Sequence, residues 1–296
     1  MFAYYAMKVL SRLICLLPHG VAMAFGAGLA RVAWIFVPAT RKRLARKQAM
    51  RCLGVPAAEA ERIARASTLR FGAMLMEVLR FPVMKDRMAD YVTITGAMDE
   101  VRAAVTAGKG AIFATSHSGN WELMGGAFAC AGLPIVGVAK KQSAQGMDRF
   151  INEYRTLVGM HITYQTGVRE MFRMIDAGWI IGLISDQDPS LRDGVIVDFF
   201  GQPTNAFTGA AAIARRCGVP IFPVFIHREA NGHHIVTVDP PIVVEKTDDR
   251  AADVLRVTQC INTRIEEWIR TYPEEWFWLH DRWKSLREET NEKGVS

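Results

Sequence analysis

From residue 91 onward, short apolar runs rich in β-branched and aromatic side chains alternate with longer segments of helical periodicity. Strands that alternate with helices in this way predict an α/β fold, in which helices cover a sheet. The expected strands are residues 91–95, 111–115, 134–138, 161–164, 179–185, 195–200, 219–226 and 234–238. The expected helices are 57–80, 98–107, 121–131, 143–158, 168–177, 207–217 and 248–271. With 22% charged residues, the chain is neither a disordered nor a polytopic membrane protein.

Basic side chains are concentrated at the N-terminus. Residues 1–58 contain nine lysines and arginines and no acidic residue. The rest of the chain contains 27 basic and 30 acidic residues, so the formal net charge of +6 comes entirely from this first segment. A nucleic-acid-binding face is not normally confined to one terminal segment, and we therefore expect no nucleic-acid partner.

The same N-terminal segment is strongly apolar. Residues 13–30 carry no formal charge, and a helix of this length spans about 27 Å, close to the thickness of a bilayer core. We interpret this run as a single membrane anchor, either spanning or lying in the interface. A cleaved signal peptide and a buried core helix are the alternatives. We accordingly divide the chain into an anchor with its basic flank at 1–56 and a catalytic domain at 57–296.

The flanking charges and the cysteines predict the location of the catalytic domain. Six lysines and arginines between residues 41 and 51 follow the apolar run, and the positive-inside bias places this side in the cytoplasm. The five cysteines are scattered, without the CxxC spacing, which favours a reducing compartment.

The most informative motif follows the expected strand 111–115 and reads HSGNWE at 117–122. Ligands of open α/β sheets bind at the carboxyl ends of the strands. On one continuous helix, His117 and Glu122 would lie about 140° apart and would not meet. If His117 instead lies in a loop before the helix, its ring can reach the Glu122 carboxylate. We therefore predict a general base in which Glu122 orients His117, whereas a loop histidine bonded to a backbone carbonyl is the alternative.

The motif HSGNWE is a version of the HxxxxD/E motif of glycerolipid-type acyltransferases. More narrowly, the chain resembles the secondary (lauroyl/myristoyl) acyltransferases of lipid A biosynthesis. Three further stretches support the resemblance, which runs from about residue 5 to 285: DQD at 186–188 followed by GVIVDFFGQP, then TGAAAIARRCGVPIFPV, then YPEEWFWLHDRWK. The resemblance implies a glycerolipid-acyltransferase-like fold with a single mixed sheet and an N-terminal membrane helix.

The resemblance also implies a reaction. An acyl chain would pass from an acyl carrier protein thioester to a hydroxyl of a lipid A precursor of the Kdo-lipid IVA type, at the inner leaflet of the cell inner membrane. No metal or cofactor is expected. His117 would be the general base, and Glu122 would stabilise its imidazolium. Arg155, Arg149, Asn120 and Asp186 are the predicted substrate-binding residues, with Arg155 contacting an anion or the transition state.

Three alternative functions stay open from the sequence. An acyltransferase could use another acceptor, such as a lysophospholipid or glycolipid, with acyl-CoA as donor. Asp186 and Asp188 could instead hold a divalent ion in a glycosyltransferase, although carboxylates that cap a turn are equally expected there. The last alternative is a non-catalytic lipid-binding protein.

Two polar and aromatic stretches have structural interpretations. Thr204 and Asn205 are expected to cap the helix at 207–217. Trp276, Trp278 and Trp283 are expected in a C-terminal helix, either packed inside the fold or placed at a membrane surface.

Overall fold

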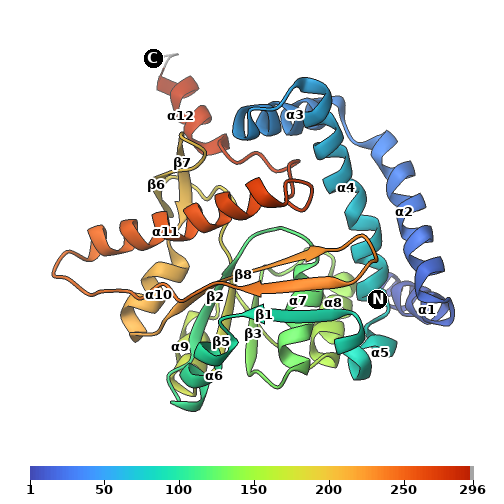
Figure 1. The fold of residues 1–296 in the computed structure, drawn as a ribbon, viewed down its shortest axis with the longest axis horizontal. Helices are drawn as coiled ribbons and strands as arrows, with labels where there is room; N and C mark the ends of the chain where they lie inside the picture. The colour runs from blue at the N-terminus through green and yellow to red at the C-terminus, as the bar shows by residue number, and fades with distance from the viewer. Residues whose placement is uncertain (294–296) are drawn as a thin grey trace.

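A seven-stranded sheet forms the centre of the computed structural model, which describes residues 1–293 (Figure 1). Its strands are β1 (Val92–Gly96), β2 (Ala111–Thr115), β3 (Ile135–Ala139), β4 (His161–Tyr164), β5 (Ile180–Ile184), β8 (Ile221–Arg228) and β9 (His234–Val238). They lie in the order β1-β9-β8-β2-β5-β3-β4. Neighbouring strands are parallel except β8 and β9, which are antiparallel. The predicted α/β fold with a mixed sheet is confirmed.

The central strand β2 is buried on both faces. Ala111 and Phe113 belong to one hydrophobic cluster, whereas Ile112 and Ala114 belong to a second cluster on the other side. Successive side chains of a strand point to opposite faces, so this alternation requires helices on both sides of the sheet. Helices cover both faces of the sheet in the structure.

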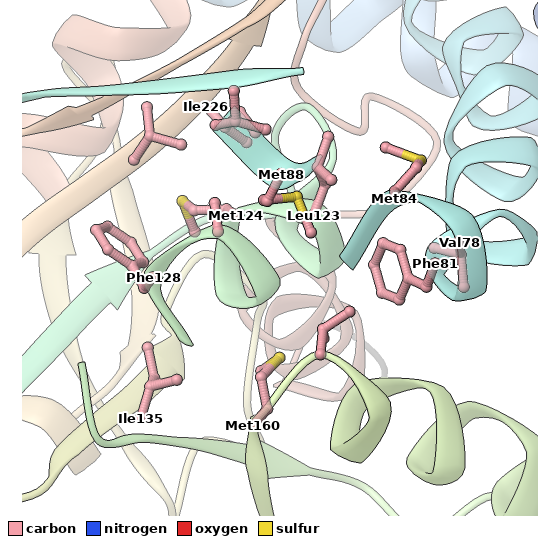
Figure 2. Close-up of a cluster of buried hydrophobic side chains, with 14 of the residues drawn as sticks. Val78, Phe81, Met84, Met88, Leu123, Met124, Phe128, Ile135, Met160 and Ile226 are labelled. Carbon is pink, nitrogen blue, oxygen red and sulfur yellow. The ribbon is translucent and has the colours of Figure 1, made fainter. Parts of the chain in front are cut away.

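Helices α6 (Met98–Thr106), α7 (Trp121–Cys130) and α8 (Gln145–Leu157) contribute to the cluster that contains Phe113, together with α5 (Phe81–Met84) and the 3-10 helix η1 (Lys85–Asp90). Helices α9 (Val168–Asp176), α10 (Gly209–Cys217) and α11 (Arg250–Thr271) contribute to the opposite cluster. Figure 2 shows part of the first cluster, in which Leu123 and Met124 of α7 lie beside Met88.

A small antiparallel ribbon lies outside the main sheet. It pairs β6 (Gly194–Asp198), which the sequence predicts, with β7 (Pro203–Phe207), which it does not. The predicted capping role of Thr204 and Asn205 is wrong, because both residues lie in β7 and α10 begins only at Gly209. The Asn205 side chain instead donates to the carbonyls of Pro189 and Ser190 and so fastens the ribbon to the loop after β5.

The C-terminal tryptophans pack inside the protein. Trp276, Trp278 and Trp283 are buried and lie in the irregular segment before α12 (Lys284–Lys293), not in a helix. Of the two interpretations that the sequence allowed, the structure has the packed one. The Trp276 and Trp278 rings meet edge to face with centroids 4.7 Å apart.

The N-terminal apolar run is divided between two helices. Helix α1 (Phe2–Leu16) ends before Pro18, which is the residue preceding α2 (His19–Phe36), so the apolar run over 13–30 is interrupted near its start. Proline lacks an N–H and fixes its φ angle, and it therefore suits the start of a helix better than its interior. Among residues 1–293, α2 is the one helix long and apolar enough to cross a membrane, which by itself is weak support for an anchor.

Helix α2 runs alongside α4 (Ala57–Leu79), as Figure 1 shows at the edge of the molecule. The two backbones touch at Gly26 and Gly72: a Cβ on Gly72 would lie 2.1 Å from the Gly26 carbonyl oxygen. Only residues without a side chain allow this approach. Only 17% of the residues of α2 are buried, and large apolar side chains such as Phe25, Leu29 and Phe36 are exposed.

Helices α1 and α3 (Ala39–Leu53) also contact the rest of the protein. Lys8 of α1 forms an ion pair with Glu153 of α8 at 2.7 Å. The Gln48 side chain of α3 donates to the carbonyls of Trp278 and His280 and accepts from the Arg282 N–H. The N-terminal helices are thus packed onto the catalytic region, and the division of the chain at residue 56 stays a prediction.

Candidate active site

His117 and Asp186 meet at the carboxyl rim of the sheet. His117 follows β2, and Asp186 follows β5, which is the parallel neighbour of β2. His117 Nδ1 lies 2.8 Å from Asp186 Oδ1, and the His117 backbone N–H donates to Asp186 Oδ2 at 2.9 Å. Parallel neighbours end at the same rim, and this is why two residues 69 positions apart come together.

The Asp186 carboxylate is buried, with 3% of the residue exposed. Its Oδ2 atom also accepts a hydrogen bond of 2.7 Å from the Trp276 indole N–H. Burial raises the pKa of this carboxyl group, but the charge and hydrogen bonds of His117, together with Trp276, outweigh burial and bring the pKa to about 2. Asp186 is therefore a carboxylate at neutral pH.

The imidazole of His117 is accessible from one side. Its side chain is 21% exposed, and the ring meets Trp121 edge to face with centroids 5.0 Å apart. Burial lowers the pKa of His117, but the Asp186 charge and hydrogen bond, and then the Glu122 charge, raise it above its ordinary value. Because Asp186 accepts at Nδ1, the neutral ring carries its proton there, and Nε2 has no hydrogen-bond partner within residues 1–293.

Glu122 does not hold His117. Its two carboxylate oxygens accept from Arg155, Oε2 from Nε at 2.8 Å and Oε1 from Nη2 at 2.6 Å. The predicted hydrogen bond between Glu122 and His117 is therefore wrong. The physical reason is that the rigid guanidinium fork matches both oxygens of Glu122, whereas Asp186 on the adjacent strand reaches Nδ1.

The other predicted substrate-binding residues lie in different places. Arg155 lines the cavity described below, and its Nη1 atom also donates to Asn152. Asn120 is buried: its amide oxygen caps α7 by accepting from the Leu123 N–H, and its amide nitrogen donates to Glu77. Arg149 lies over the Tyr4 ring at 4.4 Å. Neither Asn120 nor Arg149 contributes to the cavity wall.

The two carboxylates of the DQD sequence have separate partners. Asp186 faces His117, whereas Asp188 accepts from the Ser285 backbone N–H at 2.6 Å and from its hydroxyl at 2.7 Å. Within residues 1–293, no group of three or more His, Cys, Asp or Glu side chains is placed to hold a metal ion.

A cavity of about 560 Å³ opens beside His117. His117, Glu122 and Arg155 line it, and further polar wall residues include Lys140 and Gln142 after β3 and Ser185 and Gln187 after β5. Met7 of α1 and Leu75 of α4 also line it, so the N-terminal helices border the cavity.

A narrower apolar extension continues this cavity beneath α7. It has a volume of about 90 Å³ and shares Trp121, Glu122 and Arg155 with the larger space. Apart from Thr115, its other walls are apolar and come from α7, the sheet and the loop before β4: Phe113, Met124, Gly125, Phe128, Ile135, Val136, Gly137, Met160, Gly182 and Val224. The site therefore combines a proton acceptor, a fixed cation and an apolar slot.

The turn that carries His117 is held by buried groups. Gly119 has a φ of +59°, and a Cβ there would lie 2.3 Å from the Ile226 carbonyl oxygen. Glu77, fully buried on α4, accepts from Asn120 at 2.7 Å and contacts His234 and Arg228 of the β8–β9 pair. Two strands and a helix thus fix the start of α7.

Two residues of this arrangement were not predicted. Glu77 lies within a helical run whose pattern marks nothing unusual about it. Trp276 lies in the stretch YPEEWFWLHDRWK, which the sequence marks as a motif without assigning the indole N–H a partner.

A histidine bonded to a buried aspartate, beside a cavity with an apolar slot, is an arrangement suited to activating a hydroxyl for transfer of an acyl group, the reaction of an acyltransferase. Comparison of sequences agrees. A sequence model described as bacterial lipid A biosynthesis acyltransferase matches residues 1–285. The chain belongs to this family, which the resemblance drawn from HSGNWE predicted.

The individual relatives of the chain carry the names of two kinds of acyltransferase. The chain is 30% identical to a phosphatidylinositol mannoside acyltransferase of Mycolicibacterium smegmatis, over 92% of this chain and 88% of the relative. It is 29% identical to a phosphatidylinositol mannoside acyltransferase of Mycobacterium tuberculosis, over 80% and 76% respectively. It is 22% identical to a lipid A biosynthesis lauroyltransferase of Escherichia coli, over 93% and 89%.

Proposed function

We propose that this acyltransferase moves a fatty acyl chain from a thioester donor to a sugar hydroxyl of a membrane glycolipid, with His117 as the general base. The observation that carries the proposal is the contact between His117 and the Asp186 carboxylate at the mouth of a cavity with an apolar extension. Asp186 takes the orienting role that the sequence assigned to Glu122.

In the proposed reaction, His117 Nε2 removes the proton of the acceptor hydroxyl while the hydroxyl oxygen attacks the thioester carbonyl carbon. This attack forms a tetrahedral oxyanion. When the oxyanion collapses, the C–S bond breaks, and the imidazolium returns its proton to the departing thiolate. The products are an ester and a free thiol. Asp186 stabilises the imidazolium and keeps Nε2 directed toward the cavity.

Glu122 and Arg155 support this chemistry in a different way. Arg155 neutralises Glu122 and lies at the junction of the cavity and its extension. We assign the stabilisation of the oxyanion to Arg155 and to the N–H groups of Trp121 and Glu122 at the start of α7, because the N-terminus of a helix favours negative charge.

The acyl chain is assigned to the apolar extension. Its entrance adjoins Glu122 and Arg155, and its deeper wall consists of apolar side chains and of the glycines Gly125, Gly137 and Gly182. Burying apolar chain surface there is favourable by about 25 cal/mol per Å². The polar cavity beside His117 is then left for the acceptor head group.

We assign the acceptor to the glycolipids because the names of the relatives contain two different lipids that both carry sugars. The mycobacterial relatives are named for phosphatidylinositol mannoside and the Escherichia coli relative for lipid A. Both are lipids with sugar hydroxyls. A lipid A precursor of the Kdo-lipid IVA type and a mannosylated phosphatidylinositol are therefore the two acceptors to compare, with acyl carrier protein and acyl-CoA as the two donor carriers.

We further propose that the protein lies at the cytoplasmic face of the inner membrane through α1 and α2. Exposed apolar side chains line both helices: Phe2, Tyr5, Val9, Leu13, Leu16, Val21, Phe25, Leu29, Val32, Ile35 and Phe36. Exposed arginines and a lysine of α3 (Arg41, Arg43, Lys47, Arg51) add attraction to anionic lipid. Because α2 packs along α4, we favour binding in the interface over a separate spanning helix.

Vesicle sedimentation tests the membrane proposal. Replacing Phe25 and Leu29 together by aspartate should release the protein from anionic vesicles, because it places charge on the exposed face of α2. Leu255→Asp is the matched control, since Leu255 is an exposed leucine of α11. Equal binding of both variants and the unaltered protein would refute the assignment to α1 and α2.

Mass spectrometry of reaction products tests the acyl-transfer proposal. The purified protein is incubated with each acceptor and each donor carrier in turn. We expect one acceptor to gain the mass of a single acyl chain. Transfer to neither glycolipid, with transfer to a lysophospholipid, would overturn the assigned acceptor class and leave the acyltransferase activity intact.

A further inference from the structure

One flexible side chain, Met160, closes part of the apolar extension. Met160 lies between α8 and β4, is 7% exposed, and donates its backbone N–H to the Arg155 carbonyl at 3.1 Å. Figure 2 shows its side chain, with that of Ile135, pointing toward α7. Met160 is therefore anchored through its backbone to the helix that carries Arg155, while its side chain reaches into the extension.

The thioether end of Met160 fills the space left by two glycines. A Cβ added to Gly125 of α7 would lie 2.6 Å from Met160 Cε and 2.8 Å from its sulfur. A Cβ added to Gly137 of β3 would lie 3.1 Å from the same Cε atom. The helix and the strand each leave out a side chain at this level. Met160 occupies the space beside Gly125 and shares the space beside Gly137 with Ile162, whose Cδ1 atom would lie 3.2 Å from a Cβ on Gly137.

The thioether end of Met160 lies part of the way along the extension, whereas its backbone lies at the level of Ile135, because Val136 pairs with His161. Gly125 is four residues beyond Trp121 on α7, about 6 Å further from the rim at helical rise. Gly137 is two residues before the rim end of β3, about 7 Å at strand rise. Phe128 and Ile135 lie deeper on the same elements, at about 10 Å and 13 Å by the same measures. A chain that enters at Glu122 passes Met160 before it reaches them.

The chemistry of the side chain suits an adjustable wall. Methionine is unbranched and has three rotatable side-chain bonds, so it moves at little cost, whereas the β-branched Ile135 and the aromatic Phe128 are stiffer. We propose that Met160 determines the length of acyl chain that the enzyme accepts. This inference rests on the proposed function, in which the extension holds the acyl chain.

Two substitutions on opposite sides of one contact give opposite predictions. Met160→Ala removes the wall and should raise the ratio of kcat/KM for a long donor over a short donor, such as stearoyl over lauroyl, by at least ~10-fold, since one or a few methylenes in an apolar pocket change selectivity by about that factor. Gly125→Ala places a methyl group against the thioether and should lower the same ratio.

The double variant is the sharpest arm of the experiment. In Gly125→Ala/Met160→Ala the added Cβ no longer meets the thioether, so the ratio should stay near that of Met160→Ala, and the lowering caused by Gly125→Ala alone should not add. Met88→Ala is the control, because Met88 is an equally buried methionine of the same cluster that does not line the extension. It should leave the ratio unchanged within about twofold.

The outcomes separate this inference from the proposed function. If the unaltered enzyme transfers acyl chains and Met160→Ala keeps its chain-length ratio, the role of Met160 is refuted while acyl transfer stands. If the unaltered enzyme transfers no chain of any length, the proposed function itself fails. Should Met160→Ala not fold by circular dichroism, the milder Met160→Val decides, with a smaller rise of the ratio expected and an unchanged ratio contradicting the role.

Discussion

Asp186 binds His117 at two points, through the ring Nδ1 at 2.8 Å and through the backbone N–H at 2.9 Å. One carboxylate thus fixes both the imidazole and the peptide that carries it. The Trp276 indole holds the same carboxylate from the other side. A histidine bound in this way has one available nitrogen, and its direction is determined by two adjacent strands of a rigid sheet.

Asp186→Asn tests the orienting role. The variant should lower kcat by about 100-fold or more, because an amide neither stabilises the imidazolium nor reliably keeps the proton at Nδ1. Asp188→Asn is the matched control, since this carboxylate lies two positions away and bonds to Ser285. Steady-state kinetics of Asp186→Asn within a few-fold of the unaltered enzyme would exclude Asp186 as the partner of the base.

The pH dependence of kcat/KM reports the ionisation of His117 in the free enzyme. The base must be neutral, and the pKa of His117 is raised above its ordinary value of 6.5. As the pH is lowered, kcat/KM should therefore begin to fall at a pH above 6.5. Asp186→Asn removes the charge that raises this pKa and should move the acid limb of its residual activity to lower pH. An acid limb at unchanged pH would show that the ionisation of a group other than His117 causes it.

The same pKa shift links stability to pH. Because the folded-state pKa of His117 is raised, its pairing with Asp186 stabilises the protein fully below pH 6.5, and this contribution is lost as the pH rises through the folded-state pKa. The difference in unfolding free energy between the unaltered protein and His117→Ala, measured in urea, should therefore shrink from pH 6 to pH 9. A constant difference would show that the pair does not titrate in this range.

Arg155 and Glu122 should depend on each other for stability. Their side chains are only 18% and 9% exposed, so Arg155→Met leaves a nearly buried carboxylate without its partner. We expect a loss of about 3 kcal/mol in the free energy of unfolding. The double variant Glu122→Gln/Arg155→Met should recover much of it, because no unpaired charge remains. Additive losses in urea denaturation would contradict a direct pair.

The contact of α2 with α4 is testable at single glycines. Gly72→Val should destabilise the protein by about 1–3 kcal/mol or more, because even a Cβ there would lie 2.1 Å from the Gly26 carbonyl oxygen. The control is Gly28→Ala on α2, two residues after Gly26: the added methyl group meets no atom within 4 Å and should be neutral or slightly stabilising. Equal melting temperatures for both variants would refute the close packing of the two helices.

The sequence predicts the alternation of strands and helices well, because apolar period and turn residues are local properties. It places His117, Glu122 and Asp186 correctly at strand and helix ends. It does not reveal which acid is the neighbour of the histidine, because that depends on β2 and β5 being adjacent in the sheet. The sequence prediction paired His117 with Glu122 because the two residues are close in the chain. In the structure His117 pairs with Asp186, which is close to it across the sheet.

The N-terminus shows the same limit. Hydropathy over 13–30 correctly indicates an apolar surface, but it does not show that the chain breaks at Pro18 or that Gly26 rests against Gly72. The contact of Gly26 with Gly72 depends on packing with α4, whereas the break follows from the local chemistry of proline. The sequence does not predict strand β7 either. Its residues are held by contacts with Pro189, Ser190 and Arg282, which lie elsewhere in the chain.

The rate of acyl transfer by His117→Ala tests the central claim most directly. The purified protein and the variant are mixed with the donor and the glycolipid acceptor found active, and the ester product is followed by mass spectrometry in a single turnover. We predict that the variant folds normally and forms the ester at least ~100-fold more slowly, because the acceptor hydroxyl has lost its base. Ester formation at the rate of the unaltered enzyme would contradict the account.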